Sequence, residues 1–399
     1  MRPFRGRRIL LGITGGIASY KSAWLARLLT QAEAQVDVVM TRGAMQFIAP
    51  ITFEALTGRP VHTEIFEVGR ALDHIRLARE ADAIVVAPAT ADFLARAAHG
   101  HADDLLSACL LATAAPVLLV PAMNDRMWAH RQTRNNVAHL GTLGYRVLEP
   151  DEGMLAAGEG SGPGRMPEPE TIFAHVARIL ERQSLAGRNV LVTAGPTREG
   201  IDPVRFLSNR SSGKMGVALA AAAWRRGAEV TLIAGPLEVA PPVGVLVRQV
   251  ESTEQLAEAV CAELPRADAL LMAAAPADFR ATEPATSKIK KRGAPPAIEL
   301  APTIDVLRDT RAARRPGAVI VGFALETDAP LENARTKLDE KGLDLVVLNR
   351  ADEEGAGFAV DTNRVTLVSR TGAEELPLQL KTEVAETILD RVEALLGGR

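Results

Sequence analysis

Residues 9–25 read ILLGITGGIASYKSAWL, and this stretch decides how the first half of the chain folds. An apolar run of strand character breaks at Gly12, Gly15 and Gly16, and an Ala- and Leu-rich segment of helical character follows. Glycine lets a backbone approach a ligand closely, and the first amides of a helix point at an anion. The stretch therefore predicts a strand, a glycine turn and a helix that together hold a phosphate.

The spacing of these glycines excludes the two familiar phosphate-binding fingerprints. The dinucleotide fingerprint needs glycines at i, i+2 and i+5, whereas here they occur at i, i+3 and i+4. The P-loop needs a glycine before Lys-Ser/Thr, and Tyr20 occupies that place before Lys21 and Ser22. Thr14 and Ser19 are candidate hydroxyl donors to a phosphate. A tight turn whose glycines serve only packing is the alternative that spacing alone leaves open.

The composition is that of an ordinary globular protein with more than one domain. The chain has 399 residues, of which 47% are hydrophobic and 24% charged, and its net charge is −3. At about 150 residues per domain, this length predicts two or three domains. The small net charge gives no reason to expect nucleic acid or an anionic membrane as a partner. No apolar run reaches the roughly 18 residues of a membrane span.

Cysteine content and the first residues both favour a cytoplasmic protein. The two cysteines, Cys109 and Cys261, exclude a disulfide framework and fit a reducing compartment. No Cys/His cluster has zinc spacing. Arginines before the first apolar run resemble the start of a secretory signal. Three glycines in that run and the missing small-residue cleavage site favour a first strand instead.

Strands and helices alternate along the chain in two halves of similar order. Each half opens with a strand, a glycine-rich turn and a helix, and returns through a second strand. Continuous apolar strands alternating with helices indicate a parallel sheet covered on both faces. We therefore predict an α/β protein with two doubly wound, Rossmann-like domains, at residues 1–183 and 184–399. Besides the run at 9–11, the expected strands are 36–40, 83–89, 115–122, 189–195, 228–235, 269–275, 318–324, 344–349 and 364–369.

Three segments of the first half lie where ligands bind in an open parallel sheet, near the carboxyl ends of strands. They have few charges and many backbone amides, which suits an aromatic heterocycle with one phosphate. His74 is the candidate acid or base beside them. From the sequence alone, a helix cap or a surface pair with Asp73 is the simpler interpretation of this histidine. The segments are LDHI (72–75), PATAD (88–92) and PAMNDRM (121–127).

The motifs GITGGIASYK, LDHIRLAREAD, APATAD, ADDLL, PAMNDRM and GPGRM together resemble the flavin-dependent cysteine decarboxylases that bind FMN. The resemblance covers nearly all of the first half and implies a flavodoxin-like domain whose phosphate is that of FMN. In that family the flavin oxidises the thiol of a C-terminal cysteine, and the resulting thioaldehyde carboxylate loses carbon dioxide. His74 matches the active-site histidine, and Asn124 matches the asparagine that binds the substrate carboxylate. The FMN positions implied are Thr14, Gly15, Gly16, Ile17, Ser19, Thr41, Pro88, Ala89, Thr90 and Met123.

The flap before GPGRM departs from that family. Members that make phosphopantetheine often carry a cysteine there, which helps to return hydride and a proton to the ene-thiol. In this chain Ala156 and Ala157 occupy the flap and no cysteine is present, as in some relatives with glycine-rich flaps. The resemblance still implies decarboxylation, and Glu159 is the candidate proton donor.

Two loops of the second half have the pattern of an anion site. A long loop after the strand at 189–195 brings hydroxyls, glycines and Lys214 to the start of a helix, and loops of this length are usually functional or disordered. The segment 287–293 places four basic residues between glycine- and proline-containing stretches, which suits a loop that closes over phosphates. By itself, a basic run of this kind is more simply interpreted as a solvated surface loop.

Together, GPTREGIDPVR, SNRSSGKMG, PADF, KIKK and GFALET resemble phosphopantothenate–cysteine ligase over residues 187–399. A ligase half behind a flavin half is typical of the bifunctional bacterial proteins of coenzyme A biosynthesis, in which the decarboxylase consumes the ligase's product. The resemblance implies CTP and Mg²⁺. The carboxylate of 4'-phosphopantothenate attacks the α-phosphorus, and L-cysteine then displaces CMP from the acyl-cytidylate to give 4'-phosphopantothenoylcysteine. The ligands of the metal are not indicated.

The resemblance also assigns roles to single residues of the ligase half. Asn209 matches the residue bound to the activated carboxyl, and Lys288 matches the catalytic lysine of the KIKK loop. Two stretches, 275–279 and 303–306, depart from the family pattern. The proline in the first favours extended geometry at Ala275, which a strand end tolerates, and we expect the second to alter contacts to the nucleotide triphosphate without removing them. The nucleotide positions implied are Ala273, Ala274, Ala275, Asp278, Lys288, Phe323, Lys337 and Lys341.

The family also implies a homo-oligomer, with trimeric decarboxylase domains and dimeric ligase domains that combine in a dodecamer. The expected partners are small molecules, without nucleic acid or membrane. Two other functions compete with a bifunctional enzyme: a catalytically silent flavin-fold regulatory subunit, and a nicotinamide dehydrogenase with two dinucleotide domains. His74, Asn124 and the complete ligase half weigh against the first, and the missing Gly-x-Gly-x-x-Gly weighs against the second.

Overall fold

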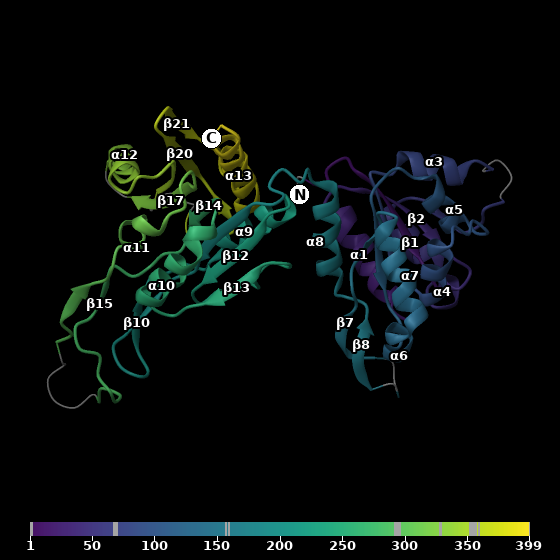
Figure 1. The fold of residues 1–399 in the computed structure, drawn as a ribbon, viewed down its shortest axis with the longest axis horizontal. Coiled ribbons are helices and arrows are strands. Elements are labelled where there is room, and N and C mark those ends of the chain that lie inside the picture. Colours follow the sequence, from purple (N-terminus) through teal and green to yellow (C-terminus); the bar gives the residue numbers. More distant parts are fainter. Residues whose placement is uncertain are drawn as a thin grey trace. The chain divides into compact units, whose positions relative to one another are not determined.

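The structure is a computed structural model that describes residues 3–66, 71–155, 158, 160–290, 297–326, 329–350, 357 and 360–398. The chain divides into two compact units, Met1–Glu181 and Arg182–Arg399 (Figure 1). Each unit has its own mainly parallel sheet with helices on both faces. The predicted α/β fold with two doubly wound domains is confirmed, and the boundary at 183 between the two activities stays a prediction.

The sheet of the first unit contains, in the part that the structure describes, β1 (Arg8–Ile13), β2 (Gln35–Met40), β3 (Val61–His62), β4 (Ala83–Ala89), β5 (Val117–Pro121) and β6 (Arg146–Val147). All pairs are parallel, and the order is β3-β2-β1-β4-β5-β6. The order reverses between β1 and β4, where Ile9 lies opposite Ala83. Ligands bind at such a point in doubly wound sheets.

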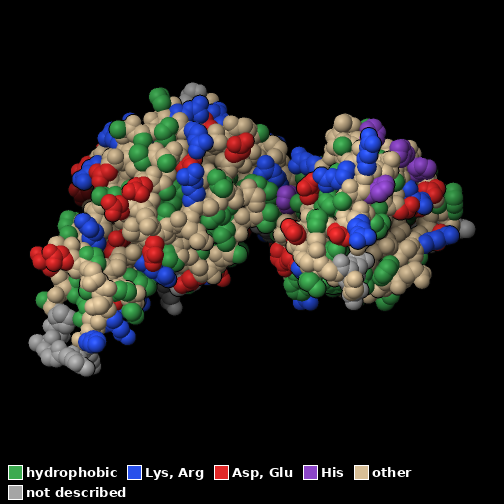
Figure 2. Space-filling view, turned by 60° about the horizontal axis from the view of Figure 1, so that its bottom comes forward, with side chains coloured by type: hydrophobic (Ala, Val, Ile, Leu, Met, Phe, Trp, Pro, Cys, Tyr) green, Lys and Arg blue, Asp and Glu red, His purple; other side chains and the backbone are tan. Residues whose placement is uncertain are grey.

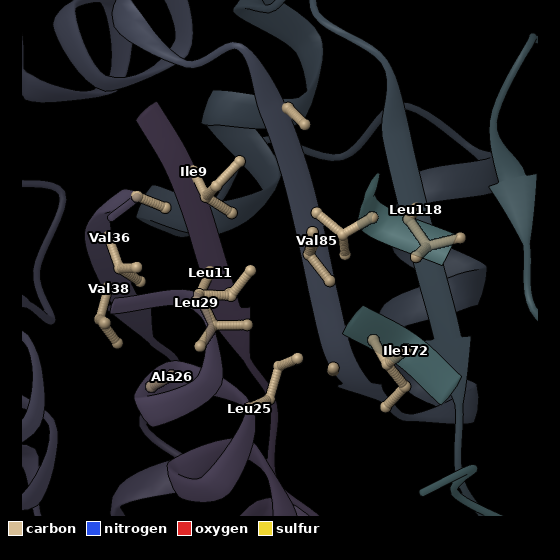
Figure 3. Packing of buried hydrophobic residues seen from close by; sticks show 14 of the residues in the cluster. Ile9, Leu11, Leu25, Ala26, Leu29, Val36, Val38, Val85, Leu118 and Ile172 are labelled. Carbon is tan, nitrogen blue, oxygen red and sulfur yellow. The ribbon is translucent and has the colours of Figure 1, made fainter. Parts of the chain in front are cut away.

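The helices of the first unit are α1 (Ser19–Gln31), α2 (Pro50–Thr57), α3 (Asp73–Glu80), α4 (Ala91–Ala98), α5 (Leu105–Ala112), α6 (Asp125–Ala129), α7 (Arg131–Thr142) and α8 (Pro169–Leu180). Successive residues of a strand point to opposite faces, so β1 contributes to two cores. Figure 3 shows Ile9 and Leu11 in one core with Leu25 of α1 and Ile172 of α8. Leu10 belongs to the other core, with residues of α3, α4, α5 and α7. Outside the sheet, β7 (Asp151–Met154) and β8 (Ser161–Arg165) form an antiparallel hairpin.

The sheet of the second unit contains, among the described residues, β9 (Asn189–Ala194), β12 (Glu229–Ala234), β13 (Leu246–Gln249), β14 (Ala269–Met272), β17 (Val319–Glu326), β18 (Leu345–Arg350), β20 (Val365–Ser369) and β21 (Gly372–Glu375). The order is β13-β12-β9-β14-β17-β18-β20-β21. The strands up to β18 are parallel, whereas β20 and β21 form an antiparallel edge. The strand expected at 364–369 is present as β20, but it runs antiparallel to β18. An apolar pattern does not encode strand direction, so the sequence did not predict this.

Helices cover both faces of this second sheet as well. One core contains Leu256 of α10 (Thr253–Glu263), Leu307 of α11 (Val306–Asp309) and Leu338 of α12 (Pro330–Glu340). On the other side, α9 (Lys214–Arg225) packs against β9 and against α13 (Lys381–Gly397). Outside this sheet, the described residues also form three small strand pairs: β10 (Arg198–Gly200) with β11 (Phe206–Ser208), β15 (Phe279–Ala281) with β16 (Leu300–Pro302), and β19 (Thr362–Asn363) with β22 (Gln379–Leu380). Short 3₁₀ helices lie at Ala44–Gln46, Leu264–Arg266 and Arg311–Ala313.

A buried group of ion pairs fastens α13 to the end of α9. Glu386 pairs with Arg225 and, at 2.6 Å, with Arg226. Arg226 also pairs with Asp390 at 2.9 Å and with Glu393 at 2.8 Å. Glu386 and both arginines are at most 6% exposed, so the charges depend on one another for compensation.

The surface carries charges of both signs. Figure 2 shows Lys and Arg side chains interspersed with Asp and Glu on the displayed face of each unit. This mixture agrees with the net charge of −3. Of the helices that the structure describes, none has the length and apolar character needed to cross a membrane.

Candidate functional site

A pocket of about 1040 Å³ lies at the carboxyl ends of the strands of the first sheet. Four lining residues, Thr14, Thr41, Thr90 and Ala122, each directly follow the end of a strand. The lining includes seven of the predicted FMN positions: Thr14, Gly15, Gly16, Ile17, Thr41, Thr90 and Met123. The other three, Ser19, Pro88 and Ala89, are buried and do not line it.

Hydrogen bonds join the glycine turn to the end of β4. The Thr14 hydroxyl donates to the carbonyl oxygen of Pro88 at 2.8 Å and accepts from the amide of Thr90 at 3.0 Å. The Ser22 hydroxyl donates to the carbonyl oxygen of Ala87 at 2.6 Å. The first helix of the unit is therefore fixed at the point where the strand order reverses.

The turn combines close packing with unused polar groups. A methyl group at Gly15 would lie 2.8 Å from the carbonyl carbon of Gly43, so this glycine serves packing. At Gly16, by contrast, a methyl group would meet nothing nearer than 3.7 Å. The Ser19 hydroxyl is buried without a hydrogen-bond partner, and α1 has no side-chain cap. Buried polar groups normally have partners, so an orphaned hydroxyl at an uncapped helix start fits a bound phosphate.

Lys21 lines the pocket, but the protein itself occupies its ammonium. The residue is 5% exposed, and Nζ donates to the carbonyl oxygen of Met166 at 2.7 Å. It also pairs with Glu168 at 3.1 Å. The lysine therefore fastens the segment after β8 to α1, in agreement with the exclusion of a P-loop.

The β7–β8 hairpin contributes one wall of the pocket and packs on the loop that carries Asn124. The carbonyl oxygen of Gly164 accepts a hydrogen bond from the Met123 amide at 3.0 Å. A methyl group at Gly164, whose φ is +152°, would lie 2.2 Å from the Met123 carbonyl oxygen. Met154 and Leu155 of the flap line the pocket. The flap residues Ala156, Ala157 and Glu159 lie outside the described residues.

The two residues expected to be catalytic in the first unit differ in position. Asn124 lines the pocket and caps α6, since its Oδ1 accepts from the Arg126 amide at 2.9 Å. His74 lies in the first turn of α3 and does not line the pocket. Its Nδ1 is buried without a partner, whereas Asp73 pairs with His62 at 3.1 Å. The simpler interpretation of His74, as a cap or as the partner of Asp73, is therefore wrong.

A second pocket, of about 460 Å³, lies at the carboxyl ends of strands in the second sheet. Asn209 lines it, and its side-chain amide donates to the carbonyl oxygen of Pro276 at 2.9 Å. Lys288 is exposed and does not line the pocket. The other predicted nucleotide positions all line it: Ala273, Ala274, Ala275, Asp278, Phe323, Lys337 and Lys341.

Four lysines line this second pocket, Lys214, Lys337, Lys341 and Lys381. Lys337 donates to the carbonyl oxygen of Phe323 at 2.7 Å, and burial, followed by repulsion from Lys341, lowers its pKa. Lys341 pairs with Asp305 at 2.9 Å. Burial by itself would raise the pKa of Asp305, but Lys341 and the Arg308 amide outweigh burial and lower it. The pair thus keeps a cation and an anion together at the pocket wall.

Sequence reasoning missed three polar residues that line this pocket, Asn349, Asn363 and Lys381. Asn363 is 1% exposed, and neither polar atom of its side chain has a hydrogen-bond partner. Lys381 donates to the carbonyl oxygens of Gly357 at 2.7 Å and Val360 at 2.5 Å. Burial, followed by repulsion from Lys214, lowers the pKa of Lys381 to about 8. All three residues lie outside the motifs, so only tertiary structure reveals them.

Two residues of the GPTRE motif, Thr197 and Glu199, make buried hydrogen bonds that support the wall of this pocket. The Thr197 hydroxyl accepts from the Ala277 amide at 2.9 Å. Glu199 accepts from the amide and the hydroxyl of Thr253, both at 2.8 Å. Both motif residues are buried, Thr197 at 1% and Glu199 at 6% exposed. They support the stretch around Ala277 without contacting the pocket.

Metal-binding and redox groups are scarce in the described part of the chain. No three His, Cys, Asp or Glu side chains in it could hold a metal ion together. Cys109 is buried and Cys261 exposed, and both are free thiols. Burial raises the pKa of Cys109 to about 12, which keeps it an unreactive thiol.

The fold and its two pockets are those of a two-domain flavoprotein. Residues 2–181 match the family described as Flavoprotein, and residues 185–396 match the DNA/pantothenate metabolism flavoprotein C-terminal domain. The Coenzyme A biosynthesis bifunctional protein CoaBC of Mycobacterium tuberculosis (strain ATCC 25618 / H37Rv) is 49% identical over 98% of this chain and 97% of its own. Its counterpart in Vibrio vulnificus (strain YJ016) is 41% identical over 100% of both chains. The chain belongs to the family of these bifunctional coenzyme A biosynthesis proteins.

A crystal structure of the C-terminal domain of the bifunctional protein CoaBC is 38% identical, with a TM-score of 0.47, over 54% of this chain and 100% of its own. Family membership confirms the resemblance inferred from the motifs: the protein is an enzyme of coenzyme A biosynthesis with a flavin-dependent decarboxylase half and a ligase half. Neither a silent regulatory subunit nor a nicotinamide dehydrogenase is favoured.

Proposed function

We propose that the first unit decarboxylates 4'-phosphopantothenoylcysteine with FMN, and that the second unit makes this compound from 4'-phosphopantothenate, L-cysteine and CTP. The observation that carries the proposal is that each unit has its own pocket, lined by residues of its own motifs. The two reactions would therefore use separate sites, in domains that we place at 1–183 and 184–399.

In the first unit, the glycine turn and the start of α1 would hold the phosphate of FMN. Support comes from the unpartnered Ser19 hydroxyl, the uncapped helix and the open space at Gly16. When bound, FMN would supply the oxidation of the substrate thiol and the later return of the electrons. Thr14 and Thr90 would keep the turn in register with the end of β4.

The substrate would lie between the flavin and the flap. We assign to the Asn124 amide the binding of the substrate carboxylate, which it would hold and orient until carbon dioxide leaves. His74 does not line the pocket of the single chain, but its buried Nδ1 has no partner. It would act as acid or base where subunits of the trimer proposed below meet. The β7–β8 hairpin would exclude water from the pocket, and Glu159 stays the expected proton donor for the last step.

In the second unit, a carboxylate oxygen of 4'-phosphopantothenate would attack the α-phosphorus of CTP. A bond forms between that oxygen and the α-phosphorus, and the bond from this phosphorus to the bridging oxygen of pyrophosphate breaks. The cysteine amine then attacks the acyl carbon, loses a proton and expels CMP. Asn209 would bind the activated carboxyl, and Lys288, Lys337 and Lys341 would stabilise the phosphate charge. Mg²⁺ would enter with the phosphates of CTP, which normally supply several of its ligands.

We also propose that the enzyme is a cytoplasmic homo-oligomer with trimeric decarboxylase and dimeric ligase domains. Free thiols at Cys109 and Cys261 support a reducing compartment. The mass of the native protein, measured by light scattering, tests the assembly directly. A monomer at assay concentration would contradict this part of the proposal.

The decisive experiment is product analysis by mass spectrometry after incubation with 4'-phosphopantothenate, L-cysteine, CTP and Mg²⁺. We expect CMP, pyrophosphate and 4'-phosphopantetheine from the wild type, despite the flap without cysteine. The His74→Asn variant should release no carbon dioxide and should accumulate 4'-phosphopantothenoylcysteine. Parallel loss of ligation at normal folded yield would refute the division into two sites. Accumulation of the oxidised ene-thiol in the wild type would show that the flap lacks a proton donor.

A further inference from the structure

Two side chains of another loop hold the backbone next to Lys288. Asp202 and Arg205 belong to the turn between β10 and β11. The Asp202 Oδ2 accepts a hydrogen bond from the Ile289 amide at 3.2 Å. The Arg205 guanidinium donates to the carbonyl oxygen of the same Ile289 at 2.5 Å. The backbone amide and the carbonyl oxygen of Ile289, the residue after Lys288, are therefore both held by side chains of this turn.

The Asp202 carboxylate is built for this contact. Its side chain has no exposed surface, and its Oδ1 accepts from the amides of Val204 at 2.8 Å and Arg205 at 2.9 Å. Burial by itself would raise the pKa of Asp202, but the amides of Val204, Ile289 and Arg205, with the Arg205 charge, outweigh burial and lower it. The acceptor is thus an ionised carboxylate, which makes stronger amide hydrogen bonds than a neutral group.

The same turn supports the segment before Lys288 as well. The Ala285 amide donates to the carbonyl oxygen of Ile201 at 2.9 Å. Asp202 itself does not line the pocket of the second unit, so it makes no direct contact there. Its contacts instead concern the path of the chain from Ala285 to Ile289, on which the exposed Lys288 side chain stands.

We infer that Asp202 is a positioning residue for ligation, which fixes the peptide beside Lys288 and thereby the place that the lysine ammonium can reach. The inference rests on the role proposed above for Lys288. A lysine side chain is long and flexible, so an exposed one is placed mainly by its backbone. A displacement of about 1 Å at a reacting group can cost about 10²-fold in rate. Release of the Ile289 amide should therefore act on the chemical step more than on nucleotide binding.

The Asp202→Asn variant tests this inference in the full-length enzyme. The oxygen of the new side-chain amide can still accept the hydrogen bond from the Val204 amide. The NH₂ group then faces the Ile289 amide, and because both groups are donors, that hydrogen bond is lost. We expect the kcat of CTP-dependent ligation to fall about 10- to 100-fold, with the KM for CTP within about twofold of wild type. Decarboxylation of supplied 4'-phosphopantothenoylcysteine should be unchanged. Glu283→Gln removes an exposed carboxylate two residues before Ala285 and is the matched control, expected at the wild-type rate.

A double-mutant cycle decides whether Asp202 acts through the lysine. In a Lys288→Gln background, Asp202→Asn should lower kcat no further, because the group that it positions is gone. An equal further loss in that background, or a wild-type kcat for Asp202→Asn alone, would overturn the inference. If Asp202→Asn folds poorly, the peptide bond between Lys288 and Ile289 can be replaced by an ester. The ester removes the Ile289 N–H donor and leaves Asp202 in place, and it should lower kcat in the same way. Absence of CTP-dependent ligation in the wild type would refute the proposed function itself, a distinct result.

Discussion

Replacement of Gly164 by alanine should disable decarboxylation and leave ligation intact. The added methyl group would lie 2.2 Å from the Met123 carbonyl oxygen and 3.3 Å from the Asn124 carbonyl carbon. Ordinary contacts between carbon and oxygen begin at about 3.3 Å, so the hairpin and the loop must separate by about 1 Å. The backbone conformation, with φ of +152°, adds strain of about 1–3 kcal/mol in a residue other than glycine. Loss of the hydrogen bond between Met123 and Gly164 adds about 1 kcal/mol.

The backbone strain and the lost hydrogen bond together cost about 2–4 kcal/mol, and this cost destabilises the β7–β8 hairpin and not the sheet. The unit should therefore stay folded with a displaced flap, and the decarboxylation rate should fall by about 10²-fold. Carbon dioxide release from 4'-phosphopantothenoylcysteine measures this, with flavin absorbance and CTP-dependent ligation followed on the same preparation. Gly153→Ala is the control in the same hairpin, because its methyl group would meet only the flexible Arg165 side chain, at 3.4 Å. A Gly164→Ala protein with full flavin content and wild-type decarboxylation would refute the reasoning.

Three further changes should separate the roles of charged residues in the second unit. Lys288→Gln should lower ligation, measured by pyrophosphate release, by about 10²- to 10³-fold, whereas Lys290→Gln should stay near wild type; equal effects would return this segment to a solvated loop. Glu386→Ala removes the carboxylate that pairs with buried Arg225 and one of the three that pair with buried Arg226, and should lower the free energy of unfolding in urea by about 3–5 kcal/mol. Glu393→Ala, at a side chain that is 26% exposed, should cost about 1 kcal/mol or less, and an equal loss would contradict the argument from burial. Burial lowers the pKa of Lys381 from 10.5 to about 8, so between these pH values the unfolded chain binds a proton that the folded chain lacks. The free energy of unfolding should rise with pH across that window by up to about 3 kcal/mol, and a Lys381→Met protein with the same slope would exclude this cause.

The architecture was predictable because strands buried on both faces leave continuous apolar runs in the sequence. The runs that became β1, β4 and β9 needed no further information. Two-residue strands such as β3 leave no run to detect, and strand direction is not encoded in apolar pattern, which explains the antiparallel edge at β20. The domain boundary predicted at 183 rests on chain length and on the repeated order of elements.

The sites were predictable where motif residues come directly after strands. Thr14, Thr41 and Thr90 line the first pocket because parallel strands bring their carboxyl ends to one edge. Lys21 shows the limit of this reasoning. Its ammonium donates to the carbonyl oxygen of Met166, which lies 145 residues further along the chain, and so it is not free to bind a ligand. Asn363 likewise reaches the second pocket from a two-residue strand that no motif marks.

Lys381 supplies the second pocket with an amine suited to covalent chemistry. With a pKa of about 8, roughly one tenth of this side chain is neutral at pH 7, against about one in three thousand for a lysine with a pKa of 10.5. Only the neutral amine attacks an electrophile, and a desolvated lysine is the usual nucleophile of this kind. Because the residue lines a pocket of about 460 Å³, a ligand that fills this pocket and carries an acylating or sulfonylating group would label Lys381 ahead of exposed lysines such as Lys290. Mass mapping of the modified residue would then report occupancy of the ligase half directly.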